Sequence, residues 1–333
     1  MTDSIQSPNP VLDPIVPVIS AHSLVTAVSV GLFESLSSGP ADPESVANRT
    51  GMNTQAARLL LDVLSQGGYV RRTEGTYALT EVSRMTLLES SPMSFVNWVK
   101  FCRFQIDAVG RLTEAAKGSG AIDLFEKMAS KEDHLLQERA MAETAKPIAS
   151  WIADVVPIPD GATRMLDVGG SHGVYSAGLC AKHPPMRSDL LELPGSIESA
   201  SQVMRESGSE EFCSLVCANV LEWQSTKKYD AVFLGNIIHH FSKAEVGAVF
   251  EKSYRHLSDE GTIAIWDIDP SENGDPSSAA FSLFFFITSG AKCYGSSEIR
   301  EFLECAGFID HEILQPPGPS SHTLHVARKR PVG

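Results

Sequence analysis

The segment MLDVGGSHG (165–173) has the pattern of a strand that runs into a glycine-rich turn and then a helix. Glycine adopts the backbone conformations of such a turn cheaply and lets a ligand approach the main chain closely. Asp167 closes the strand, where its carboxylate can accept a ligand donor directly or through water. Glu192 closes the next expected strand, 192 − 167 = 25 residues later, where an acid can accept both hydroxyls of a ribose. The alternative is a tight structural turn beside a surface acid.

The glycines of this turn do not follow the G-x-G-x-x-G spacing of dinucleotide-binding proteins, because they stand at 169, 170 and 173. An acid beside the turn suits a ligand with an ammonium group better than a pyrophosphate. S-adenosylmethionine carries a sulfonium, an ammonium and a ribose but no phosphate, and it is the cofactor that this pattern predicts.

The elements that must position these residues begin at Arg164, after the boundary signal Pro157–Gly161. The expected strands are Met165–Val168, Asp189–Leu193, Ser214–Ala218, Ala231–Leu234, Thr262–Ile268, Asp310–Leu314 and Thr323–Arg328. The expected helices start near Gly173, Gly195, Leu221 and Lys243, and a last one spans Ser297–Cys305. This alternation predicts an α/β fold with a Rossmann-like, doubly wound and mainly parallel sheet. Ligands of such sheets bind beyond the carboxyl ends of the strands.

Residues 1–90 are expected to form short helices followed by a hairpin, which is a winged-helix arrangement. Asp42 is a predicted helix N-cap, and Glu74-Gly75 is a predicted hairpin turn. Winged helices can bind DNA, but the third helix, Gln55 to Gln66, carries one cation, Arg58, and a recognition helix usually carries several. A packing or dimerisation module is therefore the favoured interpretation.

The overall composition excludes several classes of protein. Of 333 residues, 27 are Lys or Arg and 41 are Asp or Glu, so the net charge of −14 disfavours nucleic acid and anionic membranes as partners. No apolar run reaches the ~20 residues of a membrane span, and the N-terminus lacks the pattern of a signal peptide. A cytoplasmic protein with reduced cysteines is expected. Cys213 and Cys217 have no second pair at zinc spacing, so no metal site is predicted.

The chain resembles the caffeate- and acetylserotonin-type class I O-methyltransferases, a family that includes anthracycline-tailoring enzymes. The resemblance runs from about residue 15 to 328, and its most specific segments are LDVGGSHG (166–173), ELPGSIE (192–198), ANVLEW (218–223), NIIHHF (236–241) and AGF (306–308). It implies a winged-helix dimerisation domain (1–90), linking helices that line the substrate pocket (91–160), and a domain that binds S-adenosylmethionine (161–333). A homodimer is implied as well.

The resemblance implies a set of cofactor-binding residues. They are Asp167, Gly169, Gly173, Glu192, Asn219, Val220 and Gly235. Ser171 replaces a glycine of the family's turn, and Glu192 replaces an aspartate that binds the ribose. Asn219 stands where relatives have an aspartate near the adenine amine, and its amide oxygen can still accept that hydrogen bond.

The resemblance also implies a catalytic base, since His239 aligns with the histidine that precedes Asp-Trp in relatives. A neutral imidazole can take the proton of a phenol as the methyl group transfers. The alternative is a histidine that caps or packs, because Ser242 and Glu245 predict a capping box directly after it; His240 is expected to be structural. Relatives orient the base with two glutamates: Asp267 aligns with the first, although a solvated or capping acid is the alternative there, and Cys293 replaces the second.

The expected reaction is methyl transfer from S-adenosylmethionine to a phenolic or enolic hydroxyl of a small aromatic or polyketide-like natural product. Met141 and Phe285 are predicted to line the substrate pocket. Two alternatives stay open at this stage. A methyltransferase fold can use bound S-adenosylmethionine for pericyclic, decarboxylative or hydroxylation chemistry. This alternative is considered because Cys293 replaces the second glutamate of the family. A winged-helix DNA-binding regulator is the third hypothesis.

Overall fold

The computed structural model describes residues 11, 13–121, 128, 130–270, 277–318 and 320–331. The chain divides into two compact units, Met1–Gln105 and Ile106–Gly333. Each unit is described by itself, and helix α6 (Val96–Val109) contains the point of division. Within the described residues, no helix is both long and apolar enough to cross a membrane.

The first unit contains the short helices and the hairpin that the sequence predicts. Its elements are α1 (Ile15–Ser29), α2 (Leu32–Ser35), α3 (Pro43–Thr50), α4 (Thr54–Gln66), β1 (Val70–Thr73), β2 (Thr76–Leu79) and α5 (Glu81–Thr86). The side chain of Asp42 accepts a hydrogen bond from the backbone N–H of Ser45, so the predicted N-cap is confirmed. Leu32, Leu61 and Tyr77 are fully buried and join the helices to the hairpin.

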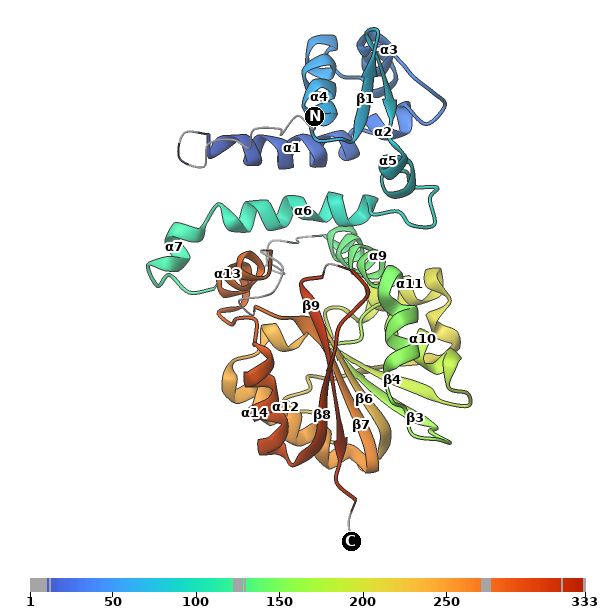
Figure 1. The fold of residues 1–333 in the computed structure, drawn as a ribbon, viewed down its shortest axis with the longest axis vertical. Coiled ribbons are helices and arrows are strands. Elements are labelled where there is room, and N and C mark those ends of the chain that lie inside the picture. Colours follow the sequence, from blue (N-terminus) through green and yellow to red (C-terminus); the bar gives the residue numbers. More distant parts are fainter. Residues whose placement is uncertain are drawn as a thin grey trace. The chain divides into compact units, whose positions relative to one another are not determined.

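The second unit is built on a seven-stranded sheet of order β5-β4-β3-β6-β7-β9-β8 (Figure 1). The strands are β3 (Arg164–Val168), β4 (Arg187–Glu192), β5 (Cys213–Cys217), β6 (Tyr229–Gly235), β7 (Leu257–Ile268), β8 (Phe308–Leu314) and β9 (His322–Lys329). Neighbouring strands pair in parallel, except that β9 runs antiparallel to both β7 and β8. The predicted doubly wound, mainly parallel sheet is confirmed.

Helices cover both faces of this sheet. The helices of this unit are α7 (Leu112–Ala116), α9 (Lys131–Val155), α10 (Val174–Lys182), α11 (Ile197–Ser207), α12 (Lys243–His256), α13 (Ser277–Ser289) and α14 (Ser296–Ala306), with 3₁₀ turns η1 (Ser209–Glu211) and η2 (Ile238–His240). In Figure 1, α12 and α14 lie on one side of the sheet and α9 and α10 on the other.

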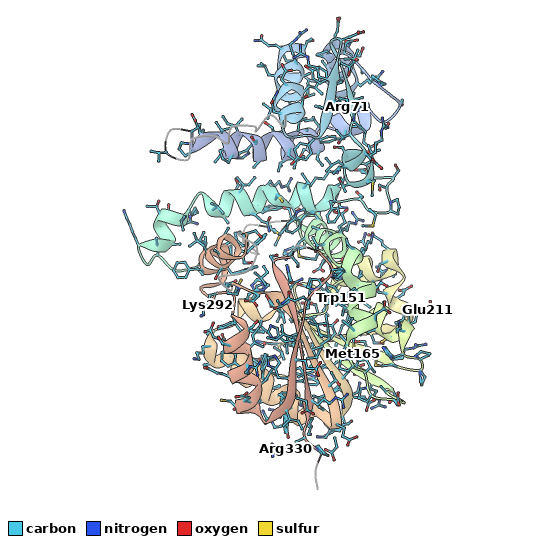
Figure 2. The ribbon with its side chains drawn as sticks, in the orientation of Figure 1. Arg71, Trp151, Met165, Glu211, Lys292 and Arg330 are labelled. Carbon is cyan, nitrogen blue, oxygen red and sulfur yellow. The ribbon has the colours of Figure 1, made fainter. Side chains whose placement is uncertain are left out.

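Alternation along the strands builds one apolar layer on each face. Met165 of β3 packs in the cluster that contains α9 and α10, whereas its neighbour Leu166 packs in the cluster that contains α12 and α14. Figure 2 shows Met165 and Trp151 inside this unit, and the Trp151 ring lies 5.9 Å from that of Trp266.

The expected helix near Leu221 is wrong, because β5 leads into a turn. The side chain of Asn219 accepts a hydrogen bond from the N–H of Leu221 at 3.0 Å, and its carbonyl accepts from Trp223 at 2.8 Å. An asparagine that bonds its own downstream backbone in this way favours a turn over a helix. The chain therefore passes directly from this turn toward β6, and Asn219 lies two residues after the end of β5.

Candidate active site

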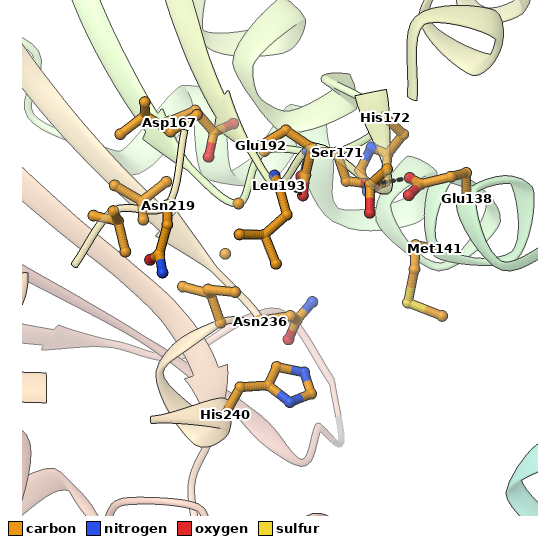
Figure 3. Close-up of a pocket in the computed structure, with 18 of the residues that line it drawn as sticks. Glu138, Met141, Asp167, Ser171, His172, Glu192, Leu193, Asn219, Asn236 and His240 are labelled. Atoms are coloured by element: carbon orange, nitrogen blue, oxygen red, sulfur yellow. Dashed lines mark hydrogen bonds between the residues drawn. The ribbon is translucent and has the colours of Figure 1, made fainter. Parts of the chain in front are cut away.

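A cavity of about 430 Å³ opens beyond the carboxyl ends of β3, β4 and β6. The lining residues come from the loops that follow these strands and β5, from η2 and from helix α9, and Figure 3 shows many of them. Strand β3 is the third of the seven strands and lies between β4 and β6. Chain order runs outward from β3 to β4 and β5 on one side and resumes with β6 on the other, so the strand order reverses at its carboxyl end. Open α/β sheets bind their ligands at this point.

The turn after β3 needs glycine at specific positions. Gly169 has φ +68°, and a Cβ atom there would lie 2.8 Å from Cδ1 of Ile237. A Cβ on Gly170 would lie 2.6 Å from Cγ of Asp167. Ser171 adopts φ +46°, a left-handed conformation that is costly for a residue with a side chain. Gly169, Gly170 and Ser171 all line the cavity.

Asp167 lies under this turn, almost completely buried, and lines the cavity. Its Oδ2 accepts a hydrogen bond from the hydroxyl of Ser176 at 2.6 Å. Burial raises the pKa of Asp167 to about 7; the Ser176 hydrogen bond opposes the rise, and the charge of Glu192 adds to it. A positive ligand would favour the ionised form of this acid.

Glu192 lines the cavity at the end of β4, and two backbone N–H groups hold its carboxylate. Oε2 accepts from Ser171 at 3.1 Å, and Oε1 accepts from Leu193 at 2.9 Å. Burial raises the pKa of Glu192, against these two hydrogen bonds. Each carboxylate oxygen has a second acceptor direction, so this geometry can still receive two hydroxyl donors.

Most of the predicted site residues meet at this one cavity. Its lining includes Asp167, Gly169, Glu192, Asn219, Val220, Gly235 and Met141. Gly173 does not line the cavity; it is the left-handed N-cap of α10, where a Cβ would lie 3.2 Å from atoms of Leu190 and Ser209. His239, Asp267 and Phe285 are also outside the lining.

His239 and Asp267 form a buried pair directly behind the cavity. Nδ1 of His239 lies 2.6 Å from Oδ1 of Asp267, and Oδ2 of Asp267 accepts the N–H of Ile238 at 3.1 Å. Burial alone would raise the pKa of Asp267, but the charge and hydrogen bond of His239 outweigh it and hold that pKa below its ordinary value. The ring of Phe285 stacks on His239 with centroids 3.7 Å apart. Asp267 therefore fixes the orientation of the His239 imidazole, and the Phe285 ring covers that imidazole.

His240 lines the cavity although the sequence suggested only a structural place for it. Its Nδ1 lies 2.8 Å from Oγ of Ser289. Desolvation by the surrounding protein lowers the pKa of His240 to about 3, and the neighbouring His239 contributes in the same direction. The ring is thus a neutral group with both donor and acceptor capacity. Asn236 also lines the cavity, at φ +54°, and its Oδ1 lies 2.8 Å from Nε2 of His322.

Cys293 is buried among Ile268 and Phe285. Burial raises the pKa of Cys293 to about 12, and the charge of Asp267 adds to the rise. A thiol with that pKa is neutral, so it cannot act as the carboxylate that the family resemblance leads one to expect at this position.

Glu138 is a lining residue that the sequence did not reveal. It lies on α9, is 5% exposed, and accepts a hydrogen bond from the hydroxyl of Ser171 (Figure 3). Burial raises the pKa of Glu138 to about 8, against the hydrogen bond from Ser171, and Glu192 adds to the rise. No local signal marked it, because α9 carries charged residues on several sides.

The charges around the cavity have one sign. The lining contains Glu138, Asp167, Glu192 and Glu245, and no lysine or arginine is among the lining residues, all of which belong to described parts of the chain. Buried carboxylates that face one another without a cation are unfavourable. The arrangement is suited to a ligand that brings positive charge, together with hydroxyl donors for Glu192.

Comparisons with known proteins cover both units of the chain. A family model described as an O-methyltransferase domain matches residues 97–309, and one described as an O-methyltransferase dimerisation domain matches residues 18–89. The 3-hydroxy-5-methyl-1-naphthoate 3-O-methyltransferase of Streptomyces sahachiroi is 24% identical over 317 residues, covering 90% of this chain and 89% of the relative. The L-tyrosine C(3)-methyltransferase of Streptomyces lavendulae is 24% identical over 92% of this chain and 88% of the relative.

Among solved structures, human N-acetylserotonin methyltransferase in complex with SAM has a TM-score of 0.86. Its sequence identity is 19%, and the match covers 99% of both chains. This similarity extends to both units of the chain and shows a shared fold.

Proposed function

The chain belongs to the O-methyltransferase family, and on that premise we propose that it transfers a methyl group from S-adenosylmethionine to a hydroxyl of a small aromatic or polyketide-like molecule. The observation that carries the proposal is the cavity after β3, where a glycine turn meets the buried acids Glu138 and Asp167 and the half-buried Glu192, without a lysine or arginine in the lining. S-adenosylmethionine has the two positive groups and the ribose that such a cavity can accept.

The cofactor residues proposed from the sequence fit this cofactor. Glu192 would accept the ribose hydroxyls, Asn219 the adenine amine, and Val220 would pack on the adenine ring. Asp167, Gly169 and Gly235 would line the path of the amino-acid end. Gly173 would act indirectly, through the backbone conformation that starts α10. When bound, the cofactor supplies an electrophilic methyl group on its sulfonium.

His239 is proposed as the general base. Asp267 is ionised, so it accepts the proton on Nδ1 of His239 and leaves Nε2 as the atom that can take the proton of an acceptor hydroxyl. Much of the remaining rate enhancement would come from alignment of the acceptor with the methyl group and from exclusion of water. Phe285 would contribute to that exclusion by covering the His239 ring.

Met141, Asn236 and His240 line the part of the cavity that we assign to the acceptor. In Figure 3, Met141 and His240 lie on opposite sides of this space. The 3-O-methyltransferase relative is named for a hydroxylated naphthoate, which supports a hydroxylated aromatic acceptor. The non-methylating alternative gains no support, because the relatives compared above are named as methyltransferases.

A homodimer is proposed through the dimerisation domain that matches residues 18–89. Helix α1 exposes a set of large apolar side chains that a second copy could cover: Ile15, Val16, Val18 and Ile19. Sedimentation equilibrium of the purified chain tests this, and a monomer at all concentrations would rule it out. The absence of nucleic acid binding and a cytoplasmic location stay predictions.

Transfer of labelled methyl groups tests the proposed function. The purified chain is incubated with S-adenosylmethionine labelled on its methyl group and a panel of hydroxylated naphthoates and related phenols. Methyl ethers of the same phenols serve as controls, because their blocked oxygen cannot accept the label. We expect label in the phenols alone. Binding of the cofactor without transfer to any acceptor, while an acceptor is otherwise transformed, would favour the non-methylating chemistry instead.

A further inference from the structure

Glu138 lines the cavity, yet the cofactor residues inferred from the family leave it without a role. It comes from α9, whereas the other acids of the cavity follow strands of the sheet or start α12. Within the described parts of the chain, Ser171 is its hydrogen-bond partner, and the bond uses Oε2. The second oxygen, Oε1, is therefore available as an acceptor at the cavity.

Ser171 fixes this carboxylate at the glycine turn. Its backbone N–H is donated to Glu192 at 3.1 Å, and its hydroxyl is donated to Glu138. One residue thus holds an acid on each side, as Figure 3 shows. A glycine would relieve the strain of φ +46° at this position but would lose the bond to Glu138. A serine at this strained position is therefore understandable if ligand binding requires the Glu138 carboxylate to be held in place.

A buried acid with these neighbours calls for a cation. Glu138 is 5% exposed, and the charge it faces across the turn is that of Glu192. Its pKa of about 8 in the free protein reflects burial and this like charge. The titratable groups nearest in the cavity are Glu192, Asp167 and His172, and none of these supplies a compensating positive charge, because burial lowers the pKa of His172 to about 4.

The identity of the cation follows from the order of the cofactor's parts. The ribose belongs to Glu192, and the sulfonium must face the acceptor near Gly235 and His240. The remaining positive group is the ammonium of the amino-acid end. Asp167 lies at that end with Oδ2 bonded to Ser176, and Glu138 adds a second acid from α9 whose Oε1 is not used by Ser171. Resting on the proposed function, we propose that Glu138, held by Ser171, accepts a hydrogen bond from the ammonium group of S-adenosylmethionine.

Two product-like ligands separate this role from a general effect on the cavity. S-adenosylhomocysteine carries the amino-acid end, whereas 5′-methylthioadenosine shares the nucleoside and the thioether but lacks that end. Calorimetry with both ligands on the wild type and on Glu138→Gln gives four dissociation constants. We expect the Kd of S-adenosylhomocysteine to rise at least ~10-fold, as for the loss of a hydrogen bond between charged groups. The Kd of methylthioadenosine should stay within about twofold.

Matched variants make the result specific. Glu143→Gln removes another buried acid of α9 that does not line the cavity, and it should change neither constant. Ser171→Gly keeps the Glu138 carboxylate but removes the hydroxyl that holds it. This variant should weaken the binding of S-adenosylhomocysteine less than Glu138→Gln does. Equal weakening of both ligands by Glu138→Gln, or no weakening of either, would overturn the inference. Wild-type protein that binds neither ligand would instead remove the proposed cofactor, and the role of Glu138 with it.

Discussion

The pairing of His239 with Asp267 is the contact on which the proposed chemistry depends. The 2.6 Å bond between Nδ1 and the ionised carboxylate fixes which nitrogen carries the proton. A general base held in this way increases the rate of reaction by a factor of about 10²–10⁴. We therefore predict that His239→Gln lowers turnover by that range and leaves the Kd of S-adenosylhomocysteine unchanged, because the base acts on the acceptor hydroxyl and not on the cofactor.

The control for this prediction is Asp267→Asn, which keeps the shape of the side chain but removes the charge. It should lower turnover as well, since an amide can also stabilise the tautomer that places the proton on Nε2. Both variants are compared in single-turnover transfer of label at saturating cofactor. Turnover that survives His239→Gln would remove His239 as the base and would direct attention to His240, which lines the cavity.

At the level of single residues, the sequence identified the acids that follow strands. Asp167 and Glu192 end β3 and β4, and the ends of neighbouring parallel strands meet wherever the sheet forms. The sequence did not predict that Glu138 and His240 line the cavity. Their position there depends on how α9 and η2 pack, which no local pattern encodes. The roles of the site residues themselves stay predictions.

The turn between β3 and α10 is the element whose shape matters most to the site. Gly170 has no room for a side chain, since a Cβ would lie 2.6 Å from Cγ of Asp167 and 2.8 Å from Cγ of Leu190. We predict that Gly170→Ala destabilises the protein by about 1–3 kcal/mol, as for an overpacked core. It should also weaken cofactor binding, because Asp167 must move. Thermal unfolding and calorimetry measure the two effects.

Gly247 offers the matched control for this substitution. It lies within α12, and a Cβ built on it meets nothing within 4 Å. Gly247→Ala should therefore stabilise the protein by about 0.5–1 kcal/mol, because alanine favours a helix interior over glycine. Equal stability of the two alanine variants would contradict the packing argument at Gly170.

Among the elements, the sequence predicted strands better than connections. The seven expected strands match the seven strands of the sheet, and the largest difference is at β7, which begins at Leu257 instead of the expected Thr262. The link from β5 to β6 was predicted as a helix, but the side chain of Asn219 bonds the downstream backbone and makes a turn. The reversed direction of β9 was not predicted either, because strand direction is set by the path of the chain and not by side-chain periodicity.

For the whole molecule, the acids of the cavity link stability to pH. Burial raises the pKa of Glu138 from its ordinary value of 4.5 to about 8 in the folded protein, so between these two pH values the folded state holds a proton that the unfolded state has lost. The free energy of unfolding therefore falls as pH rises from about 4.5 to 8 and then levels off. Asp167, with its pKa raised to about 7, acts in the same direction.

This linkage predicts that Glu138→Gln raises the melting temperature of the free protein at pH 9 and changes it little at pH 4.5. The gain can reach about 5 kcal/mol at high pH, which corresponds to roughly 10–20 °C in Tm for a unit of this size. A cationic cofactor opposes this trend as long as its own α-amino group stays protonated, below about pH 7.7–8, because the ammonium favours the ionised acid; S-adenosylmethionine should therefore stabilise the wild type more at pH 7.5 than at pH 4.5. Melting curves at three pH values, with and without the cofactor, check both statements. A Glu138→Gln variant that melts below the wild type at pH 9 would mean that the buried carboxylate stabilises the free fold, and the requirement for a cation in the cavity would lose its physical basis.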